Sequence, residues 1–201
     1  MYEYKANFQA TKEAATNQIN IIEQFYQSPA WIVAIAFFLR LVVALSLIGD
    51  QFSPERDHFS FGWETGRIAR SIAMGEGFSS PLHGSTGPTA WMTPVYVYLV
   101  AAVFKVFGVY SLKSAVVMLS LNSIFSALTC LTVFFIAQKS FGRVIAIRAG
   151  WAWALFPYAI NFAACRVWGD CLNTLLFSLV FLVALRLEDM TSLKAWVGFG
   201  L

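Results

Sequence analysis

Charged residues are scarce in this chain: aspartate, glutamate, lysine and arginine make up 12% of its 201 residues, whereas 58% are hydrophobic. A soluble domain is about one quarter charged, so this deficit indicates a protein whose main solvent is lipid. The formal net charge of +3 is too small to suggest a nucleic-acid-binding surface. We therefore expect no nucleic acid among its partners.

Cysteine is rare, and the usual cofactor motifs are absent. The three cysteines lie in or beside apolar segments, which is neither a disulfide framework nor a metal-ligand spacing. His58 and His83 match no metal motif, and there is no glycine-rich phosphate loop that would indicate a nucleotide site. We expect no cofactor and no dedicated metal site, with a divalent cation held by loop carboxylates left open.

Long apolar runs are what the sequence has in quantity. A helix needs about 20 apolar residues to cross a bilayer, and this predicts spans at about 30–49, 114–137, 145–162 and 171–185. The expected fold class is an all-α, polytopic transmembrane helical bundle. The polar N-terminal segment, residues 1–29, lacks the basic start and apolar core of a cleaved signal peptide, so the first span is expected to remain as an anchor.

A long first loop, residues 50–113, separates the first two spans and holds many charges and turn formers. Within it, the spacing of apolar residues predicts a short helix from Glu64 to Met74. The apolar run 94–107 is only about 14 residues long, which favours an interfacial helix over a span. The loop is thus expected to carry juxtamembrane helices.

A single charge, Arg40, falls in the middle of the first span. A cation at that depth costs about 2.5–3.5 kcal/mol on insertion scales. Arg40 therefore either extends to the membrane surface or faces the interior of the protein. The second alternative is favoured.

Basic residues set the expected orientation. Lys139, Arg143 and Arg148 cluster between the second and third spans, and short loops rich in lysine and arginine face the cytoplasm. If the 94–107 helix does not cross the membrane, these residues share a side with the N-terminus. We therefore expect a cytoplasmic N-terminal segment and an extracytoplasmic loop 50–113.

Three carboxylates on the extracytoplasmic side are candidates for a general base or a cation ligand: Asp57, Glu64 and Asp170. Asp170 lies against apolar sequence at the start of the last span, where an ionisable residue is a functional-site hypothesis by default. Its alternative role is the N-cap of that helix, for which aspartate is well suited.

The order of motifs in the first loop resembles that of a known family. The loop reads Asp57-His-Phe-Ser-Phe-Gly62, then Ile-Ala-Arg70, then Gly-Glu-Gly-Phe78, and continues through Pro94 to a Phe-Gly stop. This pattern resembles the N-terminal part of GT-C fold glycosyltransferases. Within that superfamily it is similar to protein O-mannosyltransferases, lipid A aminoarabinose transferases and the bacterial enzymes named after rhizobial galacturonosyltransferases.

The resemblance implies an inverting membrane glycosyltransferase of the bacterial inner (plasma) membrane. Its donor would be a polyprenyl-phosphate-linked sugar, and its acceptor an extracytoplasmic lipid, glycan or protein. A first-loop acid would act as the base, and Asp170 matches the second-loop acid. Alignment on the Asp-x-x-x-Phe-Gly pattern favours Asp57, whereas alignment on Ile-Ala-Arg leaves Glu64 as the nearest acid, so both stay candidates.

Cations on the same side would bind the donor phosphate, because arginine suits phosphate by its planar fork. The candidates are Arg67, Arg70, Lys105 and Arg166. Members of the resembled families are longer, so we expect this chain to be the N-terminal part (30–201) of a larger transferase module. The alternative is a non-enzymatic polytopic protein such as a transporter or an envelope-assembly subunit.

Overall fold

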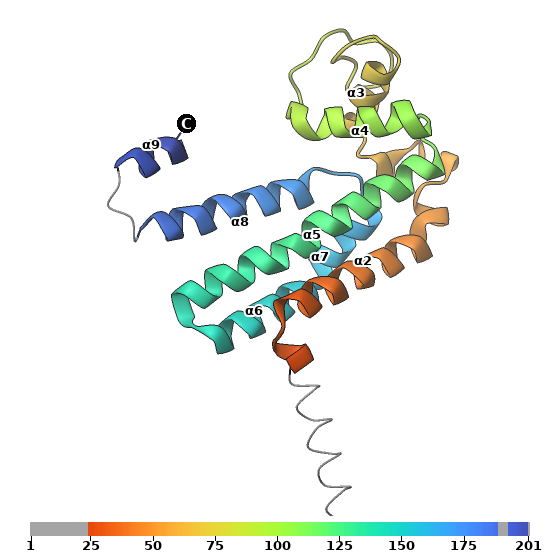
Figure 1. Ribbon diagram of the computed structural model, residues 1–201. Helices are drawn as coiled ribbons and strands as arrows, with labels where there is room; N and C mark the ends of the chain where they lie inside the picture. The colour runs from red at the N-terminus through yellow and green to blue at the C-terminus, as the bar shows by residue number, and fades with distance from the viewer. Residues whose placement is uncertain (1–23, 189–192, 201) are drawn as a thin grey trace, which may run out of the picture.

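The computed structural model describes residues 24–188 and 193–200, and within these ranges it is helical apart from turns and one isolated bridge between Ser79 and Pro88 (Figure 1). Most of the segment predicted to be cytoplasmic, 1–29, lies outside the described residues. The all-α fold class is confirmed. The α-helices are α2 (Pro29–Gln51), α3 (Glu64–Ala73), α4 (Pro94–Phe107), α5 (Leu112–Phe141), α6 (Arg143–Ala154), α7 (Pro157–Cys165), α8 (Asp170–Leu187) and α9 (Leu193–Gly200), and the first loop adds two short 3-10 helices, η1 (Pro54–Arg56) and η2 (Phe59–Phe61).

Three of these helices are long and apolar enough to cross a membrane: α2, α5 and α8, with 23, 30 and 18 residues. They coincide with the spans predicted at 30–49, 114–137 and 171–185. The chain is therefore a membrane protein with several transmembrane helices. The short helix predicted from Glu64 and the helix predicted over 94–107 are also present, as α3 and α4.

The prediction of one continuous helix over 145–162 is wrong. This apolar segment is divided between α6, which ends at Ala154, and α7, which begins at Pro157. Proline has no amide hydrogen to donate and disfavours helical geometry in the residue before it. Phe156 accordingly takes an extended conformation (φ −66°, ψ 114°), and the helix restarts with Pro157 in its first turn.

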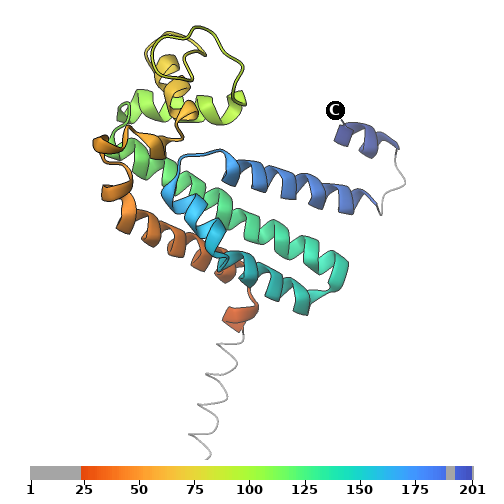
Figure 2. The same cartoon turned by 180° about the vertical axis from the view of Figure 1, so that it is seen from behind.

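The bundle is built around α5, which contacts α2, α6, α7 and α8 (Figures 1 and 2). Its buried face consists largely of small and polar residues, among them Ser123, Ser126 and Thr129. The outward faces of α2 and α8 instead carry large apolar side chains such as Phe38 and Phe177. Small residues between helices and large apolar residues outside are typical of helix packing in lipid.

Arg40 is fully buried inside the bundle, which confirms the second alternative for this residue. Its guanidinium donates hydrogen bonds to the carbonyls of Ala36 (2.9 Å), Ala154 (3.0 Å) and Trp153 (3.1 Å) and to the Ser126 hydroxyl (2.8 Å). Trp153 and Ala154 end α6, where the usual helical donors stop; the Trp153 carbonyl still accepts from the Phe156 amide (3.3 Å), whereas no backbone amide of the described residues donates to Ala154. Arg40, on α2, therefore caps the C-terminal end of α6.

The first loop and the short loop between α7 and α8 meet at the same end of the bundle (Figures 1 and 2). The Val167 amide donates to the Ser60 carbonyl (2.8 Å), which joins the two loops directly. At the opposite end, Lys139 of α5 donates to the Leu185 carbonyl of α8. Neither α3 nor α4 enters the bundle.

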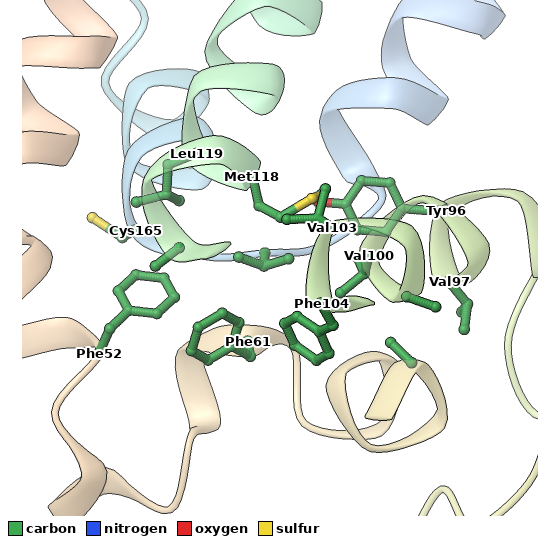
Figure 3. Close-up of a cluster of buried hydrophobic side chains, with 14 of the residues drawn as sticks. Phe52, Phe61, Tyr96, Val97, Val100, Val103, Phe104, Met118, Leu119 and Cys165 are labelled. Carbon is green, nitrogen blue, oxygen red and sulfur yellow. The ribbon is translucent and has the colours of Figure 1, made fainter. Parts of the chain in front are cut away.

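An apolar cluster anchors the first loop to this end of the bundle (Figure 3). Phe61 lies at its centre, with its ring edge-on to Phe52 of the loop and to Phe104 of α4. Met118 and Leu119 of α5 complete the cluster from the bundle side. Each of these side chains is less than 8% exposed, so the loop is held as a packed unit rather than as a free connection.

Candidate functional site

A cavity of about 340 Å³ lies in the first loop beside α3, next to several of the predicted site residues. We refer to it as the loop cavity. It brings together three of the predicted site residues, Asp57, Arg67 and Arg70. Its other lining residues are His58, Ser71, Glu76, Ser80, Leu82, His83, Gly84, Ser85 and Tyr110.

Asp57 reaches the loop cavity through an unusual backbone. Asp57 and His58 both have positive φ angles, 49° and 55°. Such conformations cost about 1–3 kcal/mol in a non-glycine residue and persist only where the surroundings hold them. Here the His58 ring stacks on Tyr110 with 4.1 Å between centroids, and this contact holds the turn that presents Asp57.

Arg67 connects the charged groups of the loop cavity. Its Nη2 lies 3.1 Å from Asp57 Oδ2 and 2.8 Å from His83 Nε2, and the same Asp57 oxygen is 3.4 Å from His83 Nε2. The Arg67 guanidinium also lies over the Trp63 ring at 4.8 Å. Its Nη1 is buried and has no hydrogen-bond partner among the described residues, so this nitrogen still has hydrogens to donate.

Exposure differs sharply within this cluster. The Arg67 side chain is 13% exposed, whereas that of Asp57 is 59% exposed. The ion pair is therefore open to water on the carboxylate side and adds little to stability. Burial raises the pKa of Tyr110, and the nearby Arg70 and Arg67 offset part of that rise. The phenol consequently remains a proton donor at neutral pH.

A second cavity, of about 250 Å³, lies between α3, α4 and the start of α8, and we call it the α4 cavity. It holds the other two candidate acids, Glu64 and Asp170, together with Asn173 and Trp168. Thr65 also lines it, and the Thr65 hydroxyl is buried without a partner among the described residues. The structure therefore places Asp57 and Glu64 in different cavities.

Asp170 is the first residue of α8, and Gly169 holds the N-cap position. No side-chain capping bond is formed there, so the N-cap role expected as one alternative for Asp170 is not observed. A carboxylate in the first turn is still favoured by the helix dipole. Asp170 borders both the α4 cavity and a third one of about 210 Å³ between α5, α7 and α8, the membrane cavity.

The four predicted phosphate ligands are not gathered in one place. Arg67 and Arg70 line the loop cavity, whereas Arg166 lies between the rings of Phe59 and Trp168, at 5.4 and 5.0 Å. Lys105 is exposed on α4 and lines none of the three cavities. Within residues 24–188 and 193–200, no group of three or more metal-ligating side chains is found.

A hydrogen-bond chain fixes the second loop relative to α4 and α5. Tyr96 donates to Asn122 Oδ1 (2.9 Å), and Asn122 Nδ2 donates to the Arg166 carbonyl (2.9 Å). Burial raises the pKa of Tyr96, which keeps this donor protonated. The intramembrane position of Asn122 was visible in the sequence, but its partners on two other elements were not.

Comparisons with models of known protein families, with curated proteins and with solved structures found no match for this chain. A functional assignment therefore depends on the residues themselves. The most informative of them are those of the loop cavity, where a carboxylate and two arginines meet at one end of a membrane bundle.

Proposed function

We propose that this chain belongs to a membrane glycosyltransferase of the GT-C type. It would move a sugar from a polyprenyl-phosphate donor to an extracytoplasmic lipid, glycan or protein. The observation that carries the proposal is the loop cavity, in which Asp57, Arg67 and Arg70 converge beside the end of the bundle. A lipid-linked phosphate enters such a site from the membrane, and its charge requires cations at the interface.

The chemistry assigns each group a role. Asp57 takes the proton from an acceptor hydroxyl or amine, whose oxygen or nitrogen attacks the anomeric carbon of the sugar. The bond between that carbon and the phosphate oxygen breaks, and polyprenyl phosphate leaves with the bonding electrons. Arg67 and Arg70 neutralise the charge that develops on the phosphate. Attack opposite the leaving group inverts the anomeric centre.

The cavities favour Asp57 over Glu64 as the base. Asp57 shares its cavity with both arginines, whereas Glu64 lies in the α4 cavity with Asp170 and no lysine or arginine in its lining. A base must lie within hydrogen-bond reach of the attacking group while the phosphate is bound. Glu64 and Asp170 are better placed to bind a part of the acceptor.

Sugar transfer from a polyprenyl-phosphate donor tests these roles. We expect Asp57→Asn to lower the rate at least about 100-fold, because the amide has no basic oxygen for the proton. Glu64→Gln should lower it less than about tenfold. Glu55→Gln is the matched control, since Glu55 lies two residues from Asp57, bonds to Ser53 and lines no cavity described above. Near-normal transfer by Asp57→Asn would remove the proposed base.

The proposed site requires the first loop to face away from the cytoplasm, in a bacterial inner membrane. Arg143 is the first residue of α6, at the opposite end of the bundle from the loop cavity, and Arg148 follows in the same helix, which fits the positive-inside rule. We expect a membrane-impermeant thiol reagent to label Ser85→Cys, but not Arg143→Cys, in intact cells. The native cysteines are buried and give a low background. Strong labelling of Arg143→Cys would reverse the orientation.

One observation favours a transporter as the second candidate. Broken helices near mid-membrane are typical of transporter substrate sites, and the α6–α7 pair is such a helix. The Trp153 and Ala154 carbonyls at the break, however, already accept hydrogen bonds from Arg40 and so are not available to coordinate a substrate. The break therefore has a structural role here, and the enzyme remains the preferred function.

A further inference from the structure

Aromatic rings form a continuous line from the interior of the bundle to the α7–α8 loop. Trp153, at the end of α6, contacts Phe156 in the break, and the line continues along α7 to Trp168. Successive ring centroids are 4.4–6.3 Å apart, within the range of direct aromatic contact. The pairs are Trp153–Phe156 (6.2 Å), Phe156–Tyr158 (6.3 Å), Tyr158–Phe162 (4.4 Å) and Phe162–Trp168 (6.0 Å).

Two guanidinium groups extend this line into the first loop. Arg166 lies between the rings of Trp168 and Phe59, and Phe59 contacts Trp63 at 5.4 Å. Trp63 in turn lies under the Arg67 guanidinium, whose Nη2 bonds to Asp57. We call the whole line, from Trp153 to Arg67, the aromatic track. Its outer end is the loop cavity.

The inner end of the aromatic track opens toward lipid. Trp153, Phe156, Tyr158 and Phe162 line the membrane cavity between α5, α7 and α8. Phe156 and Tyr158 are 46% and 62% exposed, so their rings are accessible from outside the bundle. At this depth the surrounding medium is the acyl region of the bilayer, which makes an apolar chain the natural occupant.

Both arginines of the track have capacity for an anion. The Arg166 guanidinium has no hydrogen-bond or ion-pair partner in the described part of the chain, where it contacts the two rings instead. Arg67 keeps a buried Nη1 that has no partner among the same residues. Asp170 borders the membrane cavity and repels a phosphate there, which favours a phosphate position at Arg166.

We propose that the aromatic track is the path along which a long isoprenoid chain with a terminal phosphate moves between the bilayer and the loop cavity. The chain lies along the rings of α7, and its phosphate binds first at Arg166 and then at Arg67. Aromatic faces suit an unsaturated, methyl-branched chain because each isoprene unit presents flat and methyl groups to a ring. This inference rests on the proposed function, in which the sugar phosphodiester of this lipid is the donor and its phosphate monoester the product, and it names the route of both.

Photolabelling of the wild-type chain in nanodiscs tests this path. The probe is a polyprenyl monophosphate, without a sugar, that carries a diazirine in its chain. We expect the label to map to residues 153–168, and unlabelled polyprenyl monophosphate to compete for it. Competition by phosphatidic acid at equal concentration would assign the track to ordinary membrane lipids and overturn the isoprenoid assignment. A label spread over the outward faces of α2 and α8 would overturn the track altogether.

Matched substitutions separate specific binding from general damage. Arg166→Gln should weaken binding of the monophosphate about tenfold, the usual effect of losing a charge-assisted hydrogen bond, and Arg166→Lys should restore part of it. Phe162→Leu should weaken it about threefold. Lys105→Gln and Phe177→Leu are the controls, because Lys105 is a cation outside the cavities and Phe177 an exposed α8 ring outside the track.

The results for binding and for sugar transfer distinguish the two proposals. If Arg166→Gln and Phe162→Leu bind the monophosphate like their controls while sugar transfer proceeds, the aromatic track is wrong and the proposed function stands. If the label maps to the track and Arg166→Gln weakens it, but no sugar is transferred, the path stands and the glycosyltransferase assignment fails. Absence of saturable monophosphate binding by the wild-type chain overturns the track.

Discussion

Arg40→Leu is expected to destabilise the bundle by about 2–3 kcal/mol, the sum of four hydrogen bonds at the average value measured inside membranes. The substitution leaves the Ala154 carbonyl at the α6–α7 break without a donor among the described residues, and leaves the Trp153 carbonyl with the Phe156 amide alone. It also removes the partner of the Ser126 hydroxyl. The loss is one of hydrogen bonding, because leucine itself is compatible with the surrounding apolar helices.

Unfolding of the purified chain in mixed micelles measures this effect. Arg148→Leu is the control, since Arg148 is an exposed arginine of α6 and its loss should change the unfolding free energy by less than about 0.5 kcal/mol. The unfolding free energy of Arg40→Lys should lie between those of Arg40→Leu and Arg148→Leu, because one ammonium group cannot reach all the acceptors of the guanidinium at once. Equal stability of Arg40→Leu and Arg148→Leu would show that the break does not depend on this cap.

Gly62→Ala should separate the first loop from the α7–α8 loop and lower the free energy of unfolding by about 3 kcal/mol or more. A Cβ at this position would overlap the Val167 carbonyl oxygen and approach the Trp168 ring to 2.6 Å. Gly62 also has a φ of +83°, which disfavours any side chain. The adjoining bond from the Val167 amide to Ser60 would be lost with the contact.

Hydrogen exchange at the Val167 amide reports this separation directly. Gly84→Ala is the matched control, because Gly84 has nearly the same φ (+81°) but no atom within 4 Å of the point that a Cβ would occupy. Gly84→Ala should lower the free energy of unfolding only by its backbone strain, about 1 kcal/mol, and leave the Val167 amide protected from hydrogen exchange. Protection of Val167 in Gly62→Ala equal to that in Gly84→Ala would contradict the close packing of the two loops.

The sequence predicted the elements whose signals are local. Apolar runs of sufficient length located α2, α5 and α8, and the apolar spacing after Glu64 located α3. The break in 145–162 had a local signal too, Pro157, but hydrophobicity over the whole segment outweighed it in the prediction. Arg40 could be placed in the interior only as one of two alternatives, because most of its acceptors come from helices more than 80 residues away.

The sequence predicted several residues of the candidate site but not which of them share a cavity. Asp57, Arg67 and Arg70 were identified from the loop sequence, yet their separation from Glu64 depends on the positive φ angles at Asp57 and His58. Aspartate and histidine adopt such angles more often than most residues, but this tendency is too weak to locate them in a sequence, and tertiary packing decides where they occur. For the same reason His83 and Tyr110 entered the site only through the structure, since neither belongs to a recognisable motif.

The central claim is that the loop cavity binds a lipid-linked phosphate through Arg67. The most direct test is the affinity of the chain in nanodiscs for polyprenyl monophosphate, compared between wild type, Arg67→Gln and the control Arg56→Gln. Arg56 is an exposed cation in the turn before Asp57 and does not line the cavity. We predict affinity at least about tenfold weaker for Arg67→Gln and unchanged for Arg56→Gln. Equal affinity of Arg67→Gln and wild type would contradict the claim.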